Sequence, residues 1–220
     1  MSQLITKFTH KIELWASKNS LVYWFAAQYY RNVIQKEIDL ANITDSDNVL
    51  FIGGGVCPLS AILLHQHTGA KLTVIDNNPS CIKRAQRNVD RLGLSDYVRI
   101  LYDDGVNIGC DLTEYSVVHF AMQVSPMELV FHKVEKKVLP GTKLLVRKPK
   151  KHVSLLYCTL SSLTHCSHIM HSGAGNIGST LLYVKKERKT QKHKTRERIY
   201  EKEMSACITD TAITDCPIAV

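Results

Sequence analysis

The sequence predicts an α/β fold in which strands and helices alternate around a mostly parallel sheet. Residues 49–76 have the pattern of a buried strand, three glycines, a helix and a second strand that ends in Asp76. Further β-branched, apolar runs alternate with helical spacing as far as residue 147, and two such runs then follow in succession. This order predicts a sheet covered on both faces, with an antiparallel C-terminal hairpin at its edge.

Residues 1–41 are expected to form helices ahead of the sheet, because apolar residues recur there every three or four positions. A polar break at 17–20 separates two such stripes, and the second stripe, through 21–40, is rich in aromatic residues. The simplest interpretation is a helical pair packed on the sheet. The alternative is a lid whose tyrosines, including Tyr29 and Tyr30, face a ligand.

The remaining elements are expected in chain order. Helices are predicted at 58–67, 81–92 and 127–138, strands at 49–52, 72–75, 98–102, 115–122 and 144–147, and closing strands at 168–171 and 180–185. Residues 153–163 fit either a helix or a loop. We therefore divide the chain into N-terminal helices (1–41), a nucleoside-binding domain (42–187) and a basic, mobile tail (188–220).

The glycine turn Gly53, Gly54 and Gly55 is the first candidate binding element. A turn from a strand straight into a helix needs residues without a Cβ, so that a ligand can approach the backbone. Free N–H groups at a helix start then point at that ligand. Asp76 ends the next strand, where its carboxylate can accept hydrogen bonds from both ribose hydroxyls, although it could instead cap the following helix. The unit is predicted to bind a nucleoside.

Residues that follow the other strands complete the candidate site. Asn77 lies beside the ribose acid, and either Asp103 or Asp104 could face the adenine edge or simply cap a turn. Ala121 and Gln123 follow the fourth strand, where such folds line the reacting centre, and Gln123 is the polar residue there.

Composition and charge narrow the class of partner. The net charge is +8, and residues 185–203 contribute nine Lys/Arg and four Glu, so the rest of the chain carries only +3. A nearly neutral body argues against nucleic acid as a partner. The apolar stretch 21–27 is too short to span a membrane. Seven Cys without a repeating pair spacing favour reduced thiols and a cytoplasmic location.

No metal site is expected. His165, Cys166, His168 and His171 fit none of the strong zinc spacings, and alternation along a strand would place them on two faces.

Three motifs carry a resemblance to a known family. Asp76 with Pro79, followed by Asp103-Asp104 after the next strand, resembles the class I methyltransferase fold, which is Rossmann-like and binds S-adenosylmethionine (SAM). The first motif, F-I-G-G-G-x-x-P-L-S at 51–60, is instead similar to that of nicotianamine synthase-like enzymes. Y-Y-R-N-V-x-x-x-E at 29–37 and G-x-x-N-x-x-S-T at 173–180 resemble two further stretches of that family, and the similarity covers about residues 26–187.

The resemblance implies a transferase with SAM as co-substrate. Nicotianamine synthase-like enzymes move the aminocarboxypropyl group of SAM to an amine, release methylthioadenosine and so make metallophores. It also implies a tyrosine that positions the reacting amine, for which Tyr29 and Tyr30 are the candidates, with Gln123 as a further polar candidate. The acceptor is then a small-molecule amine or amino acid.

Two alternatives remain open on the same fold. One is a small-molecule methyltransferase, and the other is a SAM-binding module without activity that docks a partner through its basic tail. The sequence leaves the acceptor open, and also the oligomeric state, for which a homodimer is one option.

Overall fold

The computed structural model describes residues 20–160, 166–173 and 175–187, without the side chains of residues 20–27 and 29. The contacts divide the chain into two units, residues 1–185 and 186–220, and the account below concerns the first. The helix expected within residues 1–16 and the tail from 188 onward lie outside the described residues.

One seven-stranded sheet organises this unit, in the order β3-β2-β1-β4-β5-β7-β6. Its strands are β1 (Asn48–Ile52), β2 (Lys71–Asp76), β3 (Val98–Tyr102), β4 (Val117–Phe120), β5 (Lys143–Pro149), β6 (Ser167–Met170) and β7 (Ile177–Val184). Strands β1 to β5 pair in parallel, whereas β7 runs antiparallel to both β5 and β6. The predicted α/β class and its antiparallel closing hairpin are confirmed.

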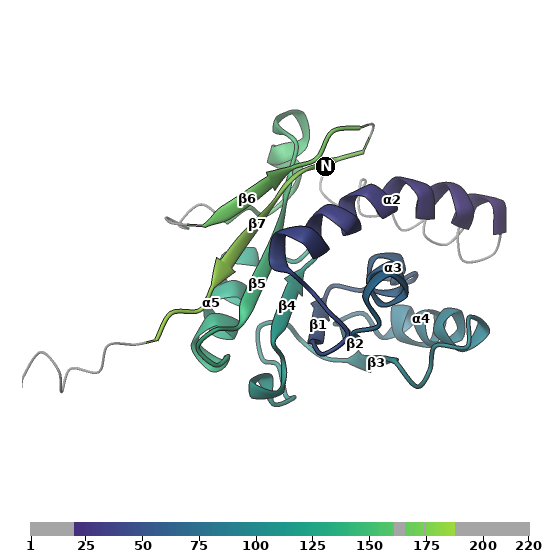
Figure 1. Cartoon of the computed structure of the whole chain (residues 1–220), viewed down its shortest axis with the longest axis horizontal. Helices are drawn as coiled ribbons and strands as arrows, with labels where there is room; N and C mark the ends of the chain where they lie inside the picture. Colours follow the sequence, from purple (N-terminus) through teal and green to yellow (C-terminus); the bar gives the residue numbers. More distant parts are fainter. Residues whose placement is uncertain (1–19, 161–165, 174, 188–220) are drawn as a thin grey trace, which may run out of the picture. The chain divides into compact units, whose positions relative to one another are not determined.

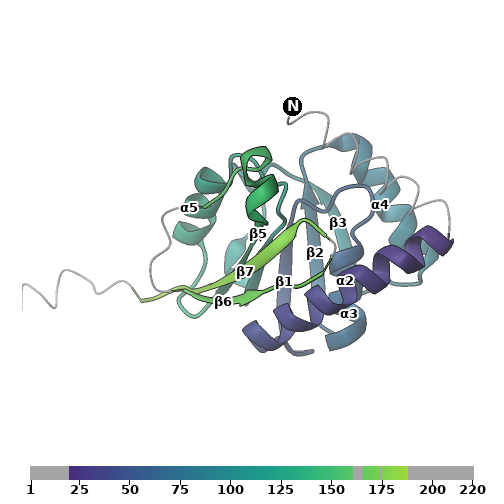
Figure 2. The ribbon, with the colours of Figure 1, turned by 90° about the horizontal axis from the view of Figure 1, so that it is seen from above.

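Helices cover both faces of the sheet, as the alternating pattern indicated (Figures 1 and 2). They are α2 (Ser20–Ala41), α3 (Leu59–Thr68), α4 (Pro79–Arg91) and α5 (Met127–Lys137), with short 3-10 turns η1 (Leu112–Glu114) and η2 (Lys151–Leu156). One core cluster joins α2, α3 and α4 to the sheet, and a second joins α5 to its other face. Burial of these apolar stripes is what fixes the helices on the sheet.

Several expected elements differ in detail. Strands β5 and β7 are longer than the predicted 144–147 and 180–185, because they pair with each other from Lys143↔Val184 to Pro149↔Ile177. The fourth strand covers Val117–Phe120 rather than 115–122, because its ladder partners on β1 end at Ile52. Of the stretch left open between helix and loop, Lys151–Leu156 form η2, residues 157–160 belong to no helix or strand, and 161–163 lie outside the described residues.

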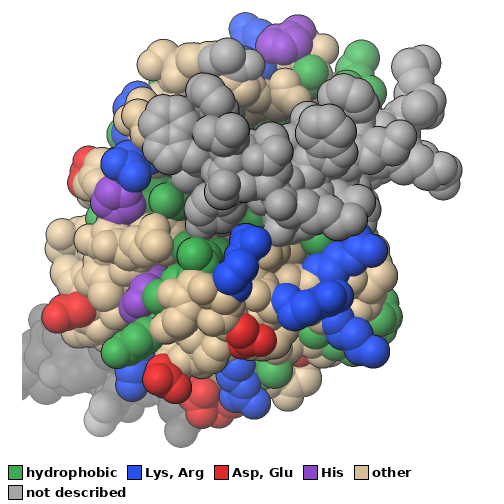
Figure 3. Space-filling model, turned by 90° about the vertical axis from the view of Figure 1, so that its right-hand side faces the viewer, with side chains coloured by type: hydrophobic (Ala, Val, Ile, Leu, Met, Phe, Trp, Pro, Cys, Tyr) green, Lys and Arg blue, Asp and Glu red, His purple; other side chains and the backbone are tan. Residues whose placement is uncertain are grey.

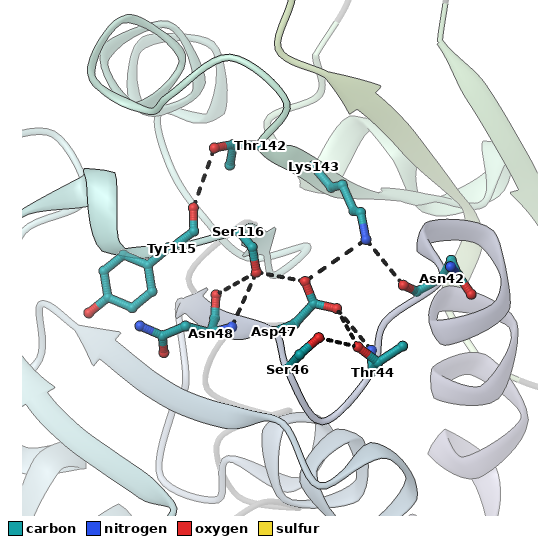
Figure 4. A network of polar contacts seen from close by, with 9 residues as sticks. All are labelled: Asn42, Thr44, Ser46, Asp47, Asn48, Tyr115, Ser116, Thr142 and Lys143. Carbon is teal, nitrogen blue, oxygen red and sulfur yellow. Dashed lines mark hydrogen bonds and ion pairs between the residues drawn. The ribbon is translucent and has the colours of Figure 1, made fainter.

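A polar network ties the loop after α2 to the amino ends of β4 and β5 (Figure 4). Ser116 Oγ donates to Asp47 Oδ1 at 2.7 Å, and Asp47 Oδ2 accepts from the Thr44 amide at 2.9 Å. Lys143 Nζ donates to the Asn42 carbonyl at 3.1 Å. These bonds hold the C-terminal end of α2 beside the amino ends of β4 and β5.

The outer face of α4 is basic. Lys83, Arg84, Arg87 and Arg91 are exposed on it, while Cys81, Ala85 and Val89 face the core. Figure 3 shows Lys and Arg side chains gathered on one side of this view of the molecule. Amphipathic spacing explains the group as the solvated side of the helix. Among the described helices, none combines the length and the apolar character that crossing a bilayer requires.

Candidate active site

The candidate site lies at the carboxyl ends of the parallel strands. Strand β1 pairs with β2 on one side and with β4 on the other, and the chain runs from β1 to β2 but from β4 to β5, so the connections after these two adjacent strands leave in opposite directions. In open α/β sheets ligands bind in the crevice at such a switch point. The structure brings together there the glycine turn after β1, Asp76 at the end of β2, Asp103 after β3 and Ala121 after β4.

The three glycines are needed for conformation and for space. Gly53 and Gly55 have φ of +88° and +63°, which side chains rarely adopt. A Cβ on Gly54 would lie 2.2 Å from Val74 Cγ1, so any larger residue there collides with β2. The Gly53 amide donates to the Ile75 carbonyl at 2.9 Å, and the Gly54 amide donates to the same oxygen at 3.2 Å. Strand β2 therefore uses the amides of Gly53 and Gly54, so neither amide is free to face a ligand.

Asp76 links this turn to the start of α4. Its Oδ2 accepts from the Gly55 amide at 2.7 Å, and its Oδ1 accepts from the Asn78 amide at 2.9 Å. Asn78, rather than Asp76, caps α4 by accepting from the Ser80 amide at 3.0 Å, and Asn77 is exposed between them. A carboxylate offers about four acceptor positions, so about two remain on Asp76 for ligand hydroxyls.

The two acids after β3 organise their own loop. Asp103 accepts from the amides of Asp104 at 2.8 Å and Gly109 at 3.0 Å, and Asp104 accepts from the Val106 amide at 3.0 Å. Both side chains are half-buried. They shape the loop beside the glycine turn, which agrees with the turn-capping alternative.

The residues after β4 lie against the glycine turn. The Ala121 amide donates to the Ile52 carbonyl at 3.0 Å, and its Cβ is 3.2 Å from the position of a Cβ added to Gly53. A larger side chain at Ala121 would therefore press on the turn. Gln123 is exposed in the following loop.

Of the two candidate tyrosines, Tyr30 is the one whose side chain is described. It is partly buried against the core, with the Arg147 guanidinium carbon 5.8 Å from its ring centroid, which is a cation–π distance. Tyr29 lies on α2, and its side chain is outside the described residues.

The polar centre under α2 is Glu37, which ends the motif at 29–37 but to which sequence reasoning gave no role. This carboxylate is 0% exposed. Its Oε1 accepts from Arg147 Nε at 2.8 Å and from Thr180 Oγ1 at 2.6 Å. Its Oε2 accepts from Arg147 Nη2 at 2.8 Å and lies 3.1 Å from His119 Nε2. All four of its acceptor positions are thus occupied.

Electrostatics keep Glu37 ionised despite its burial. Desolvation raises the pKa of Glu37, but the Arg147 charge and the hydrogen bonds from Arg147 and His119 outweigh it and hold this pKa well below its ordinary value. His119, stacked on Phe51 with ring centroids 4.0 Å apart, has its pKa lowered by burial. An ionised carboxylate facing a neutral imidazole requires the proton on His119 Nε2.

The network also reaches the glycine turn. Arg147 Nη1 donates to Ser60 Oγ at 2.9 Å, and Ser60 lies in the first turn of α3. Arg147 therefore joins Glu37 on α2 to Ser60 on α3, the helix that follows the glycine turn. These bonds fix the position of α2 relative to α3. The available signal in the sequence was an arginine inside the apolar strand L-L-V-R, which needs a buried partner.

The family model described as nicotianamine synthase protein matches residues 6–174. The chain belongs to the nicotianamine synthase family. The motifs at 29–37 and 51–60 lie within the matched residues, and the motif at 173–180 extends beyond them. The family resemblance read from the sequence is confirmed.

Individual relatives agree with the family. The chain is 27% identical over 141 residues to L-histidine 2-aminobutanoyltransferase of Yersinia pestis, a match that covers 63% of this chain and 51% of that protein. The chain thus spans about half the length of this curated relative.

Solved structures share the fold. A variant of MtNAS superposes with a TM-score of 0.71 at 22% identity, over 84% of this chain and 76% of that one. An RNA methyltransferase from Salinibacter ruber gives a TM-score of 0.56 at 18% identity, over 71% of this chain and 92% of that one. The fold is that of class I methyltransferases.

Proposed function

We propose that this member of the nicotianamine synthase family transfers the aminocarboxypropyl group of SAM to a small-molecule amine and releases methylthioadenosine. The observation that carries the proposal is Asp76, which keeps about half of its acceptor positions open beside the glycine turn, at the ligand-binding edge of the sheet. The relatives support it: MtNAS has been solved with SAM, and the Yersinia pestis relative is named for transfer to L-histidine.

In this proposal the nucleoside lies across the ends of β1 to β4. Asp76 accepts from the ribose hydroxyls, with Asn77 beside it. Asp103 and Asp104 shape the loop at the adenine edge. The glycines Gly53, Gly54 and Gly55, together with Ala121, leave room for close approach, because none of the four side chains extends beyond a methyl group.

The proposed reaction needs no covalent bond between the substrate and the protein. The sulfonium loses its positive charge as the amine attacks, so a pocket that excludes water and aligns the amine supplies most of the acceleration. Tyr29 or Tyr30 orients the amine, the proton that the amine loses passes to solvent, and Gln123 is a further polar candidate after β4. Glu37 is fully bonded, so its role is to position α2 rather than to react.

We further propose that the product is a metal-chelating small molecule made in the cytoplasm. Identifying the by-product tests the reaction directly. The full chain is incubated with SAM and a panel of amino acids, and the nucleosides are separated by chromatography. Methylthioadenosine formed only with an acceptor supports the proposal. S-adenosylhomocysteine would show methyl transfer instead, and SAM binding without any turnover would show a module without activity.

A further inference from the structure

The Arg147 guanidinium is the point at which separate segments of the chain meet. Its Nε and Nη2 donate to Glu37 on α2, each at 2.8 Å, and its Nη1 donates to Ser60 on α3 at 2.9 Å. Within the sheet Arg147 pairs with Thr180 of β7, whose hydroxyl donates to Glu37 at 2.6 Å. Each of the three motifs that resemble the family therefore ends in a residue of this cluster.

The same guanidinium lies against the ring of Tyr30, with 5.8 Å between its central carbon and the ring centroid. This is the range of a cation–π contact, which is stronger for a desolvated cation, and Arg147 is only 5% exposed. Tyr30 and Glu37 are seven positions apart on α2, so they lie on one side of the helix at a separation of about 10 Å. Arg147 therefore holds two successive turns of α2.

The helix turn that carries Tyr30 lies level with the carboxyl ends of the parallel strands. Its neighbours Gln28 and Asn32 line a pocket together with Ile177. Ile177 pairs with Pro149, the last residue of β5. Strand β5 is parallel to β4, and β4 to β1, so this is the edge of the sheet that carries the glycine turn.

Arginine is the side chain suited to this set of contacts. A guanidinium is planar and presents its donors in a rigid fork, so it binds a carboxylate with two parallel bonds and still offers a face to an aromatic ring. The bonds to Glu37 and Ser60 fix the plane of the Arg147 guanidinium. That plane in turn limits where the ring of Tyr30 can lie. A lysine ammonium has no such plane.

We propose that Arg147 is a positioning residue for the transfer reaction, because its guanidinium, held by Glu37 and Ser60, fixes the Tyr30 phenol at the edge of the site. The assignment rests on the proposed function, in which a tyrosine orients the amine. It selects Tyr30 over Tyr29, and it gives the buried cluster under α2 a part in turnover as well as in stability.

Turnover kinetics of the full chain test the assignment, with SAM, the amino acid that supports turnover and methylthioadenosine release as the readout. Tyr30→Phe keeps the ring on the guanidinium and removes only the hydroxyl, so kcat should fall about 10- to 100-fold while KM for SAM stays near the wild-type value. Arg147→Lys keeps the charge but loses the planar fork, and kcat should fall about tenfold. In the Tyr30→Phe background, Arg147→Lys should lower kcat by no more than about twofold, because the group that Arg147 positions is already lost.

This non-additivity separates positioning from a general loss of structure. Equal losses of kcat from Arg147→Lys in both backgrounds would show a structural effect and overturn the assignment, as would an unchanged kcat in Tyr30→Phe. If Arg147→Lys does not fold, Ser60→Ala removes the Nη1 bond alone and takes its place in the same cycle. Tyr97→Phe is the control, since Tyr97 is 48% exposed and stacked on His65, and its kcat should match the wild type.

The wild type distinguishes this assignment from the proposed function. If the wild type releases methylthioadenosine with an acceptor but the two variants are not coupled, the role of Arg147 is overturned and the transferase stands. If the wild type forms no methylthioadenosine with any acceptor, the proposed function fails, and the positioning role fails with it.

Discussion

Replacing Glu37 by glutamine should destabilise the protein strongly, because the substitution leaves Arg147 as a buried charge without its counter-ion. The guanidinium side chain is 4% exposed and the carboxylate 0%. The introduced amide would keep one oxygen, but its NH₂ group would face donors where Oε2 now accepts from Arg147 Nη2 and His119 Nε2. The variant therefore loses a charge and gains a donor–donor conflict.

The magnitude follows from the burial of the pair. Removing one partner of a buried ion pair costs about 3–5 kcal/mol, because the remaining charge is uncompensated in a medium of low dielectric. For a chain of this size each kcal/mol lowers Tm by about 2–4 °C, so a decrease of roughly 6–20 °C is expected. Such a loss is a large share of the roughly 5–15 kcal/mol that stabilises a typical domain.

Urea and thermal unfolding followed by circular dichroism provide the measurement. Asp39→Asn is the matched control, since Asp39 lies on the same helix but is exposed, and its carboxylate bonds to Gln35 alone among the described side chains. Its change should stay within about 0.5 kcal/mol. The double variant Glu37→Gln with Arg147→Met should lose less than the sum of the two single changes. A decrease below about 1 kcal/mol for Glu37→Gln would refute the reasoning, since it would mean that water reaches the pair.

Three further predictions concern the nucleoside site and the buried charges. Asp76→Asn should weaken methylthioadenosine about 10- to 100-fold by calorimetry, because ribose hydroxyls lose a charged acceptor, and unchanged affinity would remove Asp76 from the site. Gly54→Ala should cost about 1–3 kcal/mol through its clash with Val74, and adding Val74→Ala should restore part of the loss in urea titrations. Burial lowers the pKa of His119, so the unfolded chain binds more protons, and Tm should fall as pH drops below about 6.5. Glu37, whose folded pKa is also lowered, adds a second loss below about pH 4.3. A flat Tm from pH 7.5 to about 5 would contradict the His119 assignment, and a Tm that stays flat down to about pH 2.5 would contradict both.

Local sequence patterns were sufficient to predict where most of the helices and strands lie. Strand β3 begins and ends where the apolar run 98–102 does, and Gly69, with φ of +76°, ends α3. Periodicity and glycine positions report on a residue's own neighbourhood, so these features could be read from the chain. The ends of β4 could not, because a ladder stops where its neighbouring strand stops, and that depends on pairing across the sheet.

The sequence by itself determined the fold class, the family and the end of the parallel strands where a nucleoside site belongs, because each follows from the spacing within short segments and from the order of those segments along the chain. Only the tertiary structure decided that β2 takes up the Gly53 and Gly54 amides, and that Glu37 meets Arg147 across 110 positions of the chain. A carboxylate on an amphipathic helix and an arginine in a strand have no detectable relation in the linear chain. Packing α2 across the sheet buries both, and burial is what makes their pairing obligatory.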